Sequence, residues 1–342
     1  MLSRLVKENI LALKPYEIKD IPCRVKLDAN ESPYGYVFEE RLLEGFKPNR
    51  YPDPQAMGLK RVLAKQLNVK AENIVYGNGS DELIYYITMV FGGPVMVLQP
   101  TFAMYEIVAK VLGEETISVA LDGGFDIDVD RVVETINKEK PRIIYISSPN
   151  NPSGNAFERE RIIQVINAAT GVVIVDEAYI AFSSVEGFIN AHYENVIVMR
   201  TMSKIGFAAL RMGFAIGYER LIAEINKVRL PYNVNTLSQE LAMRALDNPY
   251  FINHTVEKIV EERRRLYETM RGLHGIKVYP SEANFILFET KSAKDIYASL
   301  LRQGILVKKL GGALEGYFRV TVGTPDENEF FLRTLREITG NV

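Results

Sequence analysis

The chain has 342 residues, of which 47% are hydrophobic and 25% are charged, and its formal net charge at pH 7 is −2. That length is enough for two domains with a large core, and the charge balance offers no basic surface to nucleic acid or to an anionic membrane. The single cysteine, Cys23, excludes a disulfide within the chain, and the three histidines lack metal-ligand spacing, so we expect no metal site.

The first 25 residues are predicted to form an arm, because charged positions interrupt the apolar ones and prolines disfavour a continued helix. No apolar run is long enough to span a bilayer, which favours a cytoplasmic protein without a membrane partner. We expect the arm (1–25) to pack with the small domain or a partner subunit. A large domain (26–240) and a small C-terminal domain (241–342) follow.

Within the large domain, apolar and β-branched runs alternate with amphipathic helices. The expected strands are 73–76, 95–99, 116–121, 142–147, 172–176, 196–199 and 212–217, and the expected helices lie near 55–68, 83–91, 101–112, 128–138, 157–168 and 218–229. This alternation predicts an α/β fold with a mostly parallel seven-stranded sheet covered by helices on both faces.

The remainder of the chain has a different pattern. A long, highly charged helix is expected near 250–274, and its charges are typical of a solvated helix face. The expected elements after it are strands 276–279, 284–288, 305–308 and 318–322 and helices 292–303 and 326–338. These elements predict a smaller α+β domain that folds against the first one.

Ligands of such parallel sheets bind outside the carboxyl ends of the strands, so the residues just past each strand are candidates for a site. Tyr105, Asn151, Asp176, Tyr179 and Lys204 occupy these positions. Asp176 ends a strand that is expected to be buried, where an unpaired charge is costly, so it needs a cationic partner.

The segment 77–82 is suited to binding phosphate, because its glycines allow close backbone approach and the following helix presents unpaired N–H groups at Ser80 and Asp81. Ser203 would add a hydroxyl donor and Arg211 a planar fork of N–H donors. The spacing matches neither the dinucleotide fingerprint nor the P-loop. Ser80 or Asp81 could also be an ordinary N-cap, and the two roles are compatible.

A phosphate clamp beside a lysine points to pyridoxal 5'-phosphate (PLP), which is both a phosphate and an aldehyde. Lys204 would bind the aldehyde covalently and later act as general base and acid, although a lysine in a loop is often only solvated. Asp176 would keep the ring nitrogen protonated, Tyr179 and Asn151 would donate to the phenolic oxygen, and Tyr105 would stack on the ring.

Arg319 lies at the start of an apolar strand in the smaller domain. An arginine that faces the cleft between the domains would bind a carboxylate or phosphate with two parallel hydrogen bonds, whereas an arginine on the surface would form an ordinary ion pair.

Segments 150–154, 176–179 and 203–211 resemble those of the fold-type I PLP-dependent enzymes, the superfamily that is similar to aspartate aminotransferase. The finer resemblance is to the histidinol-phosphate aminotransferase family. Its motifs are 13–16, 27–35, 50–53, 77–82, 100–105 and 228–234, so it runs nearly from end to end.

The resemblance implies transamination of L-histidinol phosphate with 2-oxoglutarate, a step in histidine biosynthesis. It also implies a homodimer with active sites at the interface, in which Tyr51 reaches the phosphate of the partner's cofactor. Tyr16, Asn30, Lys308 and Arg319 become substrate-binding candidates, with Tyr16 closing over the substrate and Arg319 holding the glutamate carboxylate. The family usually has arginine where Lys308 stands, and lysine lacks the bidentate fork.

Two other reactions on the same fold stay open: aromatic-amino-acid transamination and phosphothreonine decarboxylation. A PLP-binding regulator would need a DNA-binding module, for which an arm of 25 residues is too short. The sequence does not determine whether the bonds preceding Pro149 and Pro152 are cis or trans.

Overall fold

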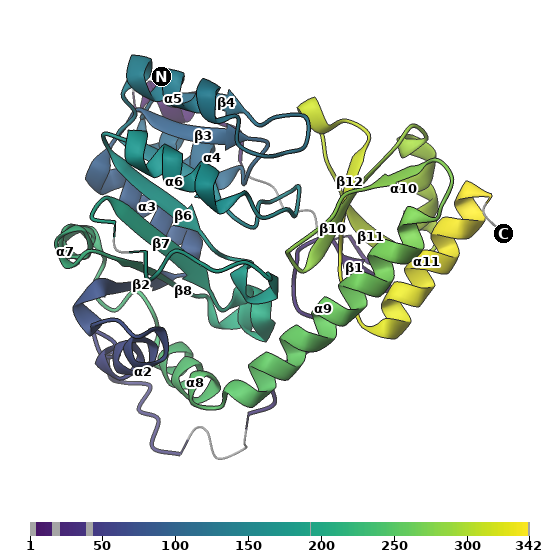
Figure 1. The fold of residues 1–342 in the computed structure, drawn as a ribbon. Helices are drawn as coiled ribbons and strands as arrows, with labels where there is room; N and C mark the ends of the chain where they lie inside the picture. Colours follow the sequence, from purple (N-terminus) through teal and green to yellow (C-terminus); the bar gives the residue numbers. More distant parts are fainter. Residues whose placement is uncertain (1–4, 16–20, 39–43, 192, 341–342) are drawn as a thin grey trace.

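The computed structural model describes residues 5–15, 21–38, 44–191 and 193–340. Two β-sheets, each with its own helices, make up this part of the chain, and the long helix α9 (Pro249–Arg271) connects them (Figure 1). Tyr16 lies outside the described residues.

The larger sheet has seven strands, as the sequence predicts. Their spatial order is β2 (Ile74–Asn78), β8 (Met212–Gly217), β7 (Val196–Thr201), β6 (Val172–Asp176), β5 (Ile143–Ser147), β3 (Val95–Gln99) and β4 (Thr116–Ala120). Only β8 is antiparallel to its neighbours, and the strands from β7 to β4 are parallel to one another. The prediction of a mostly parallel seven-stranded sheet is therefore confirmed.

Helices cover both faces of this sheet because its central strands are apolar on both sides. Every residue of β5 and β6 is buried, and alternate residues belong to opposite cores: Ile143 and Tyr145 to one, Ile144 and Ile146 to the other. One face packs against α3 (Ser80–Phe91), α4 (Met104–Leu112) and α7 (Glu219–Val228), and the other against α5 (Val129–Glu139) and α6 (Arg159–Ala168). Helices α2 (Met57–Leu67) and α8 (Thr236–Asp247) pack beside β2 and β8.

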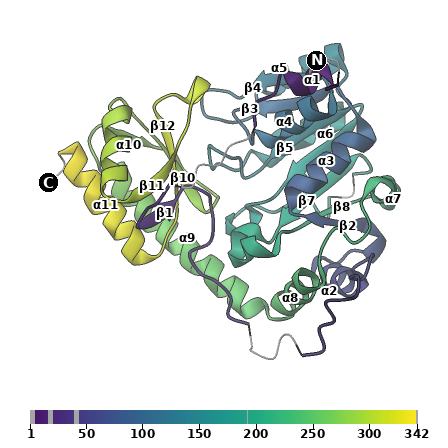
Figure 2. The same cartoon turned by 180° about the vertical axis from the view of Figure 1, so that it is seen from behind.

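The smaller sheet has five strands, in the order β1 (Val25–Leu27), β11 (Ile305–Lys309), β12 (Tyr317–Thr321), β10 (Phe285–Thr290) and β9 (Ile276–Val278). Helices α9, α10 (Ala293–Arg302) and α11 (Pro325–Thr339) lie along it, as Figure 2 shows from behind. Apolar side chains of β10, β12 and α11 form its core, among them Phe288, Phe318 and Phe331.

The predicted domain limits cut through two elements of the structure. The limit at 25/26 falls within β1, which pairs in parallel with β11, and the limit at 240/241 falls within α8, a helix that the sequence analysis did not predict. In the arm, α1 (Glu8–Leu11) lies against the large-sheet helix α4, where Asn9 Nδ2 donates to the Lys110 and Val111 carbonyls at 2.9 and 3.0 Å.

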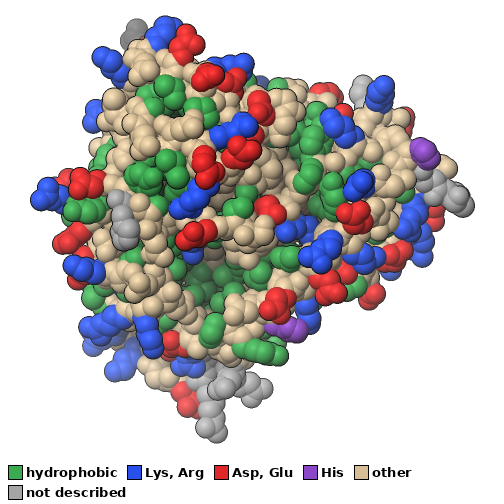
Figure 3. Space-filling model, in the orientation of Figure 1, with side chains coloured by type: hydrophobic (Ala, Val, Ile, Leu, Met, Phe, Trp, Pro, Cys, Tyr) green, Lys and Arg blue, Asp and Glu red, His purple; other side chains and the backbone are tan. Residues whose placement is uncertain are grey.

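Among the described residues, no helix combines the length and the apolar character needed to cross a bilayer. Figure 3 shows positive and negative side chains interspersed over one face of the molecule rather than gathered by sign.

Candidate active site

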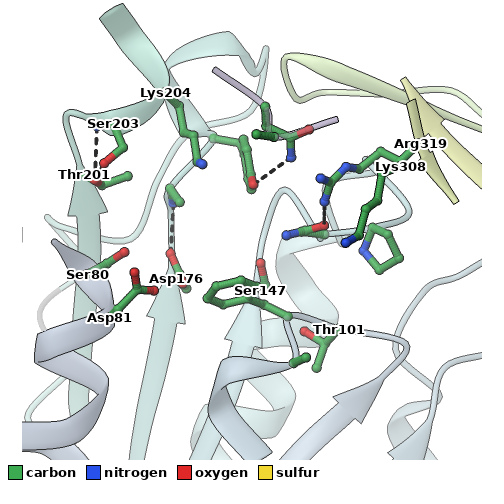
Figure 4. Close-up of a pocket in the computed structure, with 18 of the residues that line it drawn as sticks. Ser80, Asp81, Thr101, Ser147, Asp176, Thr201, Ser203, Lys204, Lys308 and Arg319 are labelled. Carbon is green, nitrogen blue, oxygen red and sulfur yellow. Dashed lines mark hydrogen bonds between the residues drawn. The ribbon is translucent and has the colours of Figure 1, made fainter. Parts of the chain in front are cut away.

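A cavity of about 360 Å³ lies where the carboxyl ends of β5, β6 and β7 meet the smaller sheet. Figure 4 shows its lining, with Asp176 and Ser203 on the large-sheet side and Lys308 and Arg319 opposite. The predicted site residues that line it are Asn30, Ser80, Asp81, Tyr105, Asn151, Asp176, Tyr179, Ser203, Lys204, Arg211, Lys308 and Arg319. Positions far apart in the sequence thus meet in one cavity.

Asp176 is the last residue of β6 and is only 4% exposed. Its Oδ2 accepts a hydrogen bond from the Tyr105 hydroxyl at 2.6 Å, and its Oδ1 accepts one from the Ala178 N–H at 3.0 Å. Burial raises the pKa of the Asp176 carboxyl from 3.8 to about 6, against the opposing effect of these two donors. None of the ion pairs found among the described residues includes Asp176, so a protonated ring nitrogen would fit this carboxylate.

Tyr105 is completely buried at the start of α4. Its ring stacks on that of Tyr145, with the centroids 4.4 Å apart and the planes 5° from parallel, and burial next to Asp176 raises its pKa well above 10. The bond between its hydroxyl and Asp176 is not evident from the sequence. Its predicted stacking on a cofactor ring stays a prediction, with one face of the Tyr105 ring already covered by Tyr145.

Lys204 follows β7 in an irregular turn, η5 (Ser203–Phe207), in which Gly206 has a φ of 107°. Figure 4 shows its side chain pointing into the cavity, and its Nζ lies 5.8 Å from the centre of the Tyr179 ring. Lys204 and Asp176 thus line the same cavity.

The predicted phosphate seat is the start of α3. Gly79 is the N-cap, with a φ of 80° and no side-chain cap, so neither Ser80 nor Asp81 is the N-cap and that alternative is wrong. The first turn thus has no side-chain acceptor at its cap, and its residues Ser80 and Asp81 line the cavity. Arg211 extends over this turn and forms an ion pair with Asp81, with Nη2 3.2 Å from Oδ2.

Thr201 also lines this end of the cavity, and the sequence analysis did not name it. Its hydroxyl donates to Ser203 Oγ at 2.9 Å and accepts from the Ser203 N–H at 3.1 Å. Its place just before the Ser203–Lys204 pair, at the end of β7, was the signal that could have identified it.

Asn151 connects the two sides of the cavity. Its Oδ1 accepts from Arg319 Nη1 at 2.6 Å, and Arg319 Nη2 donates to the Asp28 carbonyl at 2.7 Å. Arg319 is 9% exposed, and Lys308 is its register partner across β11 and β12. Two cationic side chains thus lie next to each other on the small-sheet side of the cavity.

The same region contains the two bonds that the sequence left undetermined. The peptide bonds preceding Pro149 and Pro152 are both cis.

Tyr51 does not line the cavity of this chain. It is 81% exposed and stacks on Tyr232, with ring centroids 4.6 Å apart. This placement leaves its phenol available to another molecule.

Comparisons with known proteins agree with this geometry. The model of the family described as "Aminotransferase class I and II" matches residues 19–335. The chain is 44% identical, over 347 residues, to a histidinol-phosphate aminotransferase from Aquifex aeolicus, with 97% of this chain and 98% of that one covered.

Two crystal structures with the same fold are a histidinol-phosphate aminotransferase from Clostridium acetobutylicum and one from Sinorhizobium meliloti in complex with pyridoxal-5'-phosphate. The first has a TM-score of 0.86 and 27% identity and covers 93% of this chain and 100% of its own. The second has a TM-score of 0.88 and covers 98% of each chain, and at 22% identity it shows the fold alone. Because the family model matches residues 19–335 and the 44% identity extends over 97% of this chain, the chain belongs to the histidinol-phosphate aminotransferases of the class I and II aminotransferase family.

Proposed function

We propose that the protein catalyses the PLP-dependent transamination of L-histidinol phosphate and 2-oxoglutarate to 3-(imidazol-4-yl)-2-oxopropyl phosphate and L-glutamate, in L-histidine biosynthesis. The observation that carries this proposal is the meeting of the Lys204 amine and the buried Asp176 carboxylate in one cavity. PLP itself, when bound, supplies an electron sink for the substrate.

The residues at the cavity floor suit the ring of PLP. Asp176 pairs with the ring nitrogen and keeps it protonated, which compensates the cost of burying the carboxylate. Tyr179 and Asn151 donate to the phenolic oxygen. For Asn151 the donor is Nδ2, because Oδ1 is bonded to Arg319.

The start of α3 holds the phosphate. The N–H groups of Ser80 and Asp81 lie at the positive end of the helix dipole, and Ser203 and Arg211 add a hydroxyl and a guanidinium. Arg211 already lies over this turn through its ion pair with Asp81.

Lys204 carries the proton in the reaction. Its Nζ holds the cofactor covalently before the substrate binds. Once the substrate amine has taken its place, the neutral Nζ would act as general base on the carbon that bears the amino group and then, as an ammonium, as the general acid that returns the proton.

Arg319 and Lys308 bind the anionic groups of the substrates. Arg319 accommodates the glutamate carboxylate bidentately, and Lys308 adds a point charge beside it. Tyr16 is proposed to close over the substrate.

The working form is a homodimer in the cytoplasm. An exposed pair of stacked aromatic rings, Tyr51 and Tyr232, beside Leu230, which is 63% exposed, suits burial against a second copy. In that dimer Tyr51 binds the phosphate of the partner's cofactor.

The test is the visible absorbance of the purified protein with PLP. We expect a visible band that bleaches with histidinol phosphate and returns with 2-oxoglutarate, which reports both half-reactions. Phenylalanine and phosphothreonine are added in parallel. Bleaching by phenylalanine alone would move the activity to aromatic amino acids, and carbon dioxide release from phosphothreonine would move it to decarboxylation. Absence of any band, with Lys204→Ala behaving identically, would contradict the PLP proposal.

A further inference from the structure

Strand β12 is linked by hydrogen bonds to both residues that are proposed to hold the phenolic oxygen of the cofactor, directly to Asn151 and through Asn30 to Tyr179. Arg319 and Thr321 lie two residues apart on this strand, so their side chains share one face. Arg319 binds Asn151 directly (Figure 4), and Thr321 reaches Tyr179 through Asn30.

Hydrogen bonds hold Asn30 at its backbone N–H, its carbonyl and both polar atoms of its side chain. It is 1% exposed, with a φ of 55° that asparagine tolerates better than most residues. Its backbone N–H donates to Thr321 Oγ1 at 2.9 Å, its Oδ1 accepts from the Thr321 hydroxyl at 3.2 Å, and its carbonyl accepts from Asn284 Nδ2 at 3.0 Å.

These bonds fix which end of the amide faces Tyr179. Thr321 Oγ1 accepts from the Asn30 backbone N–H and donates its one hydrogen to Asn30 Oδ1. Nδ2 therefore lies on the side of Tyr179, to whose hydroxyl oxygen it donates at 3.0 Å.

An amide nitrogen can only donate, so the hydrogen of the Tyr179 hydroxyl cannot point back to Asn30. The Tyr179 ring is held by the edge of Phe285, with centroids 5.1 Å apart, and its hydroxyl hydrogen is left to point into the cavity. Two cationic groups lie near these rings: Lys204 Nζ is 5.8 Å from the centre of the Tyr179 ring, and the Arg319 guanidinium carbon is 5.3 Å from the centre of the Phe285 ring. The cavity is also lined by the charged residues Asp28, Asp81, Asp176, Arg211 and Lys308.

We propose that Asn30, held by Thr321, is a positioning residue. It orients the Tyr179 hydroxyl so that this group donates a hydrogen bond into the cofactor cavity. This role rests on the proposed function, since the acceptor is the phenolic oxygen of PLP. It differs from the expectation that Asn30 contacts the substrate. The smaller sheet thereby controls both donors to that oxygen, one through Arg319 and the other through Thr321.

The experiment is a pH titration of the visible absorption of the holoenzyme. Thr321→Val removes the hydroxyl at nearly constant shape, and Thr321→Ser retains it. A weaker donor leaves the ionised phenolic oxygen less stabilised, so the chromophore holds its proton to higher pH. We expect the spectral pKa to rise by about half a unit to one unit in Thr321→Val and by more in Tyr179→Phe, with Thr321→Ser close to the unmodified protein.

The inference would be overturned if the spectral pKa were unchanged in Thr321→Val but shifted in Tyr179→Phe. It would also be overturned if Thr321→Val lowered the thermal stability without changing the spectral pKa. If Thr321→Val does not fold, Asn30→Gly removes the amide from a backbone that suits glycine and must give the same rise. Failure of the proposed function is distinguishable, because the unmodified protein would then show no visible band.

Discussion

At the scale of single residues, the unusual group is the Asp176 carboxylate. It is buried with two hydrogen-bond donors, and its pKa of about 6 lies above the 3.8 of an exposed aspartate. The burial that makes it a suitable partner for a ring nitrogen also makes its charge unfavourable when no cation is present.

We predict that Asp176→Asn stabilises the cofactor-free protein above pH 6. Between pH 3.8 and about 6 the folded state retains a proton that the unfolded state has lost, so stability falls as pH rises through this window and stays lower above it. The shift corresponds to about 3 kcal/mol. Thermal denaturation at pH 8 and at pH 3.5 measures it. A thermal midpoint of the variant at pH 8 that is equal to or lower than that of the unmodified protein would contradict the prediction. The same variant should lose affinity for PLP.

Arg319 is a residue at which even a charge-conserving substitution should weaken glutamate binding. Arg319→Lys cannot make both the bond to Asn151 and the bond to the Asp28 carbonyl together with a bidentate carboxylate contact. We expect the KM for glutamate, measured by steady-state kinetics, to rise about 10- to 100-fold, with a smaller change in kcat. The control is Arg271→Lys, at an exposed ion pair on α9. Equal KM values for the two variants would contradict the prediction.

At the scale of elements, the shape of the proposed phosphate seat depends on how closely β8 approaches the start of α3. Gly213 pairs with Gly77 in the sheet, and a Cβ added at Gly213 would lie 2.6 Å from the Gly79 carbonyl carbon and in contact with the Ser80 nitrogen. These are backbone atoms, so the strand or the helix start must move.

Gly213→Ala is therefore predicted to cost about 1–3 kcal/mol of stability and to weaken PLP binding, because the N–H groups of the first turn shift away from the phosphate. The matched control is Gly123→Ala, where an added Cβ meets nothing within 4 Å. Thermal midpoints and PLP titrations of both variants provide the measurement. If Gly213→Ala bound PLP with unchanged affinity, PLP binding would not depend on the close approach of Gly213 to the start of α3.

At the scale of the whole molecule, the cavity of one chain lacks Tyr51, which lies on the surface beside Tyr232. If each site of a homodimer takes Lys204 from one chain and Tyr51 from the partner, a hybrid of the two variants has both defects in the same site, and its other site is intact. Two defective variants can then complement each other.

We predict that coexpressed Lys204→Ala and Tyr51→Ala chains are more active, at limiting PLP, than the mean of the two variants purified separately. In random dimers about half are hybrids with one intact site in two, so about one quarter of all sites are intact. Activity equal to the mean, in hybrids verified by differential tags, would place Tyr51 at its own chain's site or at none.

Much of this arrangement could be predicted from local patterns. A buried strand such as β6 is recognisable from four consecutive apolar, β-branched residues, and the carboxyl ends of parallel strands must share one edge of the sheet. Those two facts place Asp176, Lys204 and Asn151 together before any coordinates are known.

What the sequence by itself determined was the larger sheet, its helices other than α8 and most of the residues at its edge, because side-chain period and strand–helix alternation are local properties of the chain. Only the tertiary structure decided that β1 pairs with β11, that the Tyr105 hydroxyl binds Asp176, and that Thr321 orients Tyr179 through Asn30. Those contacts join residues 71 to 291 positions apart, and such pairings depend on packing between elements rather than on any pattern along the chain.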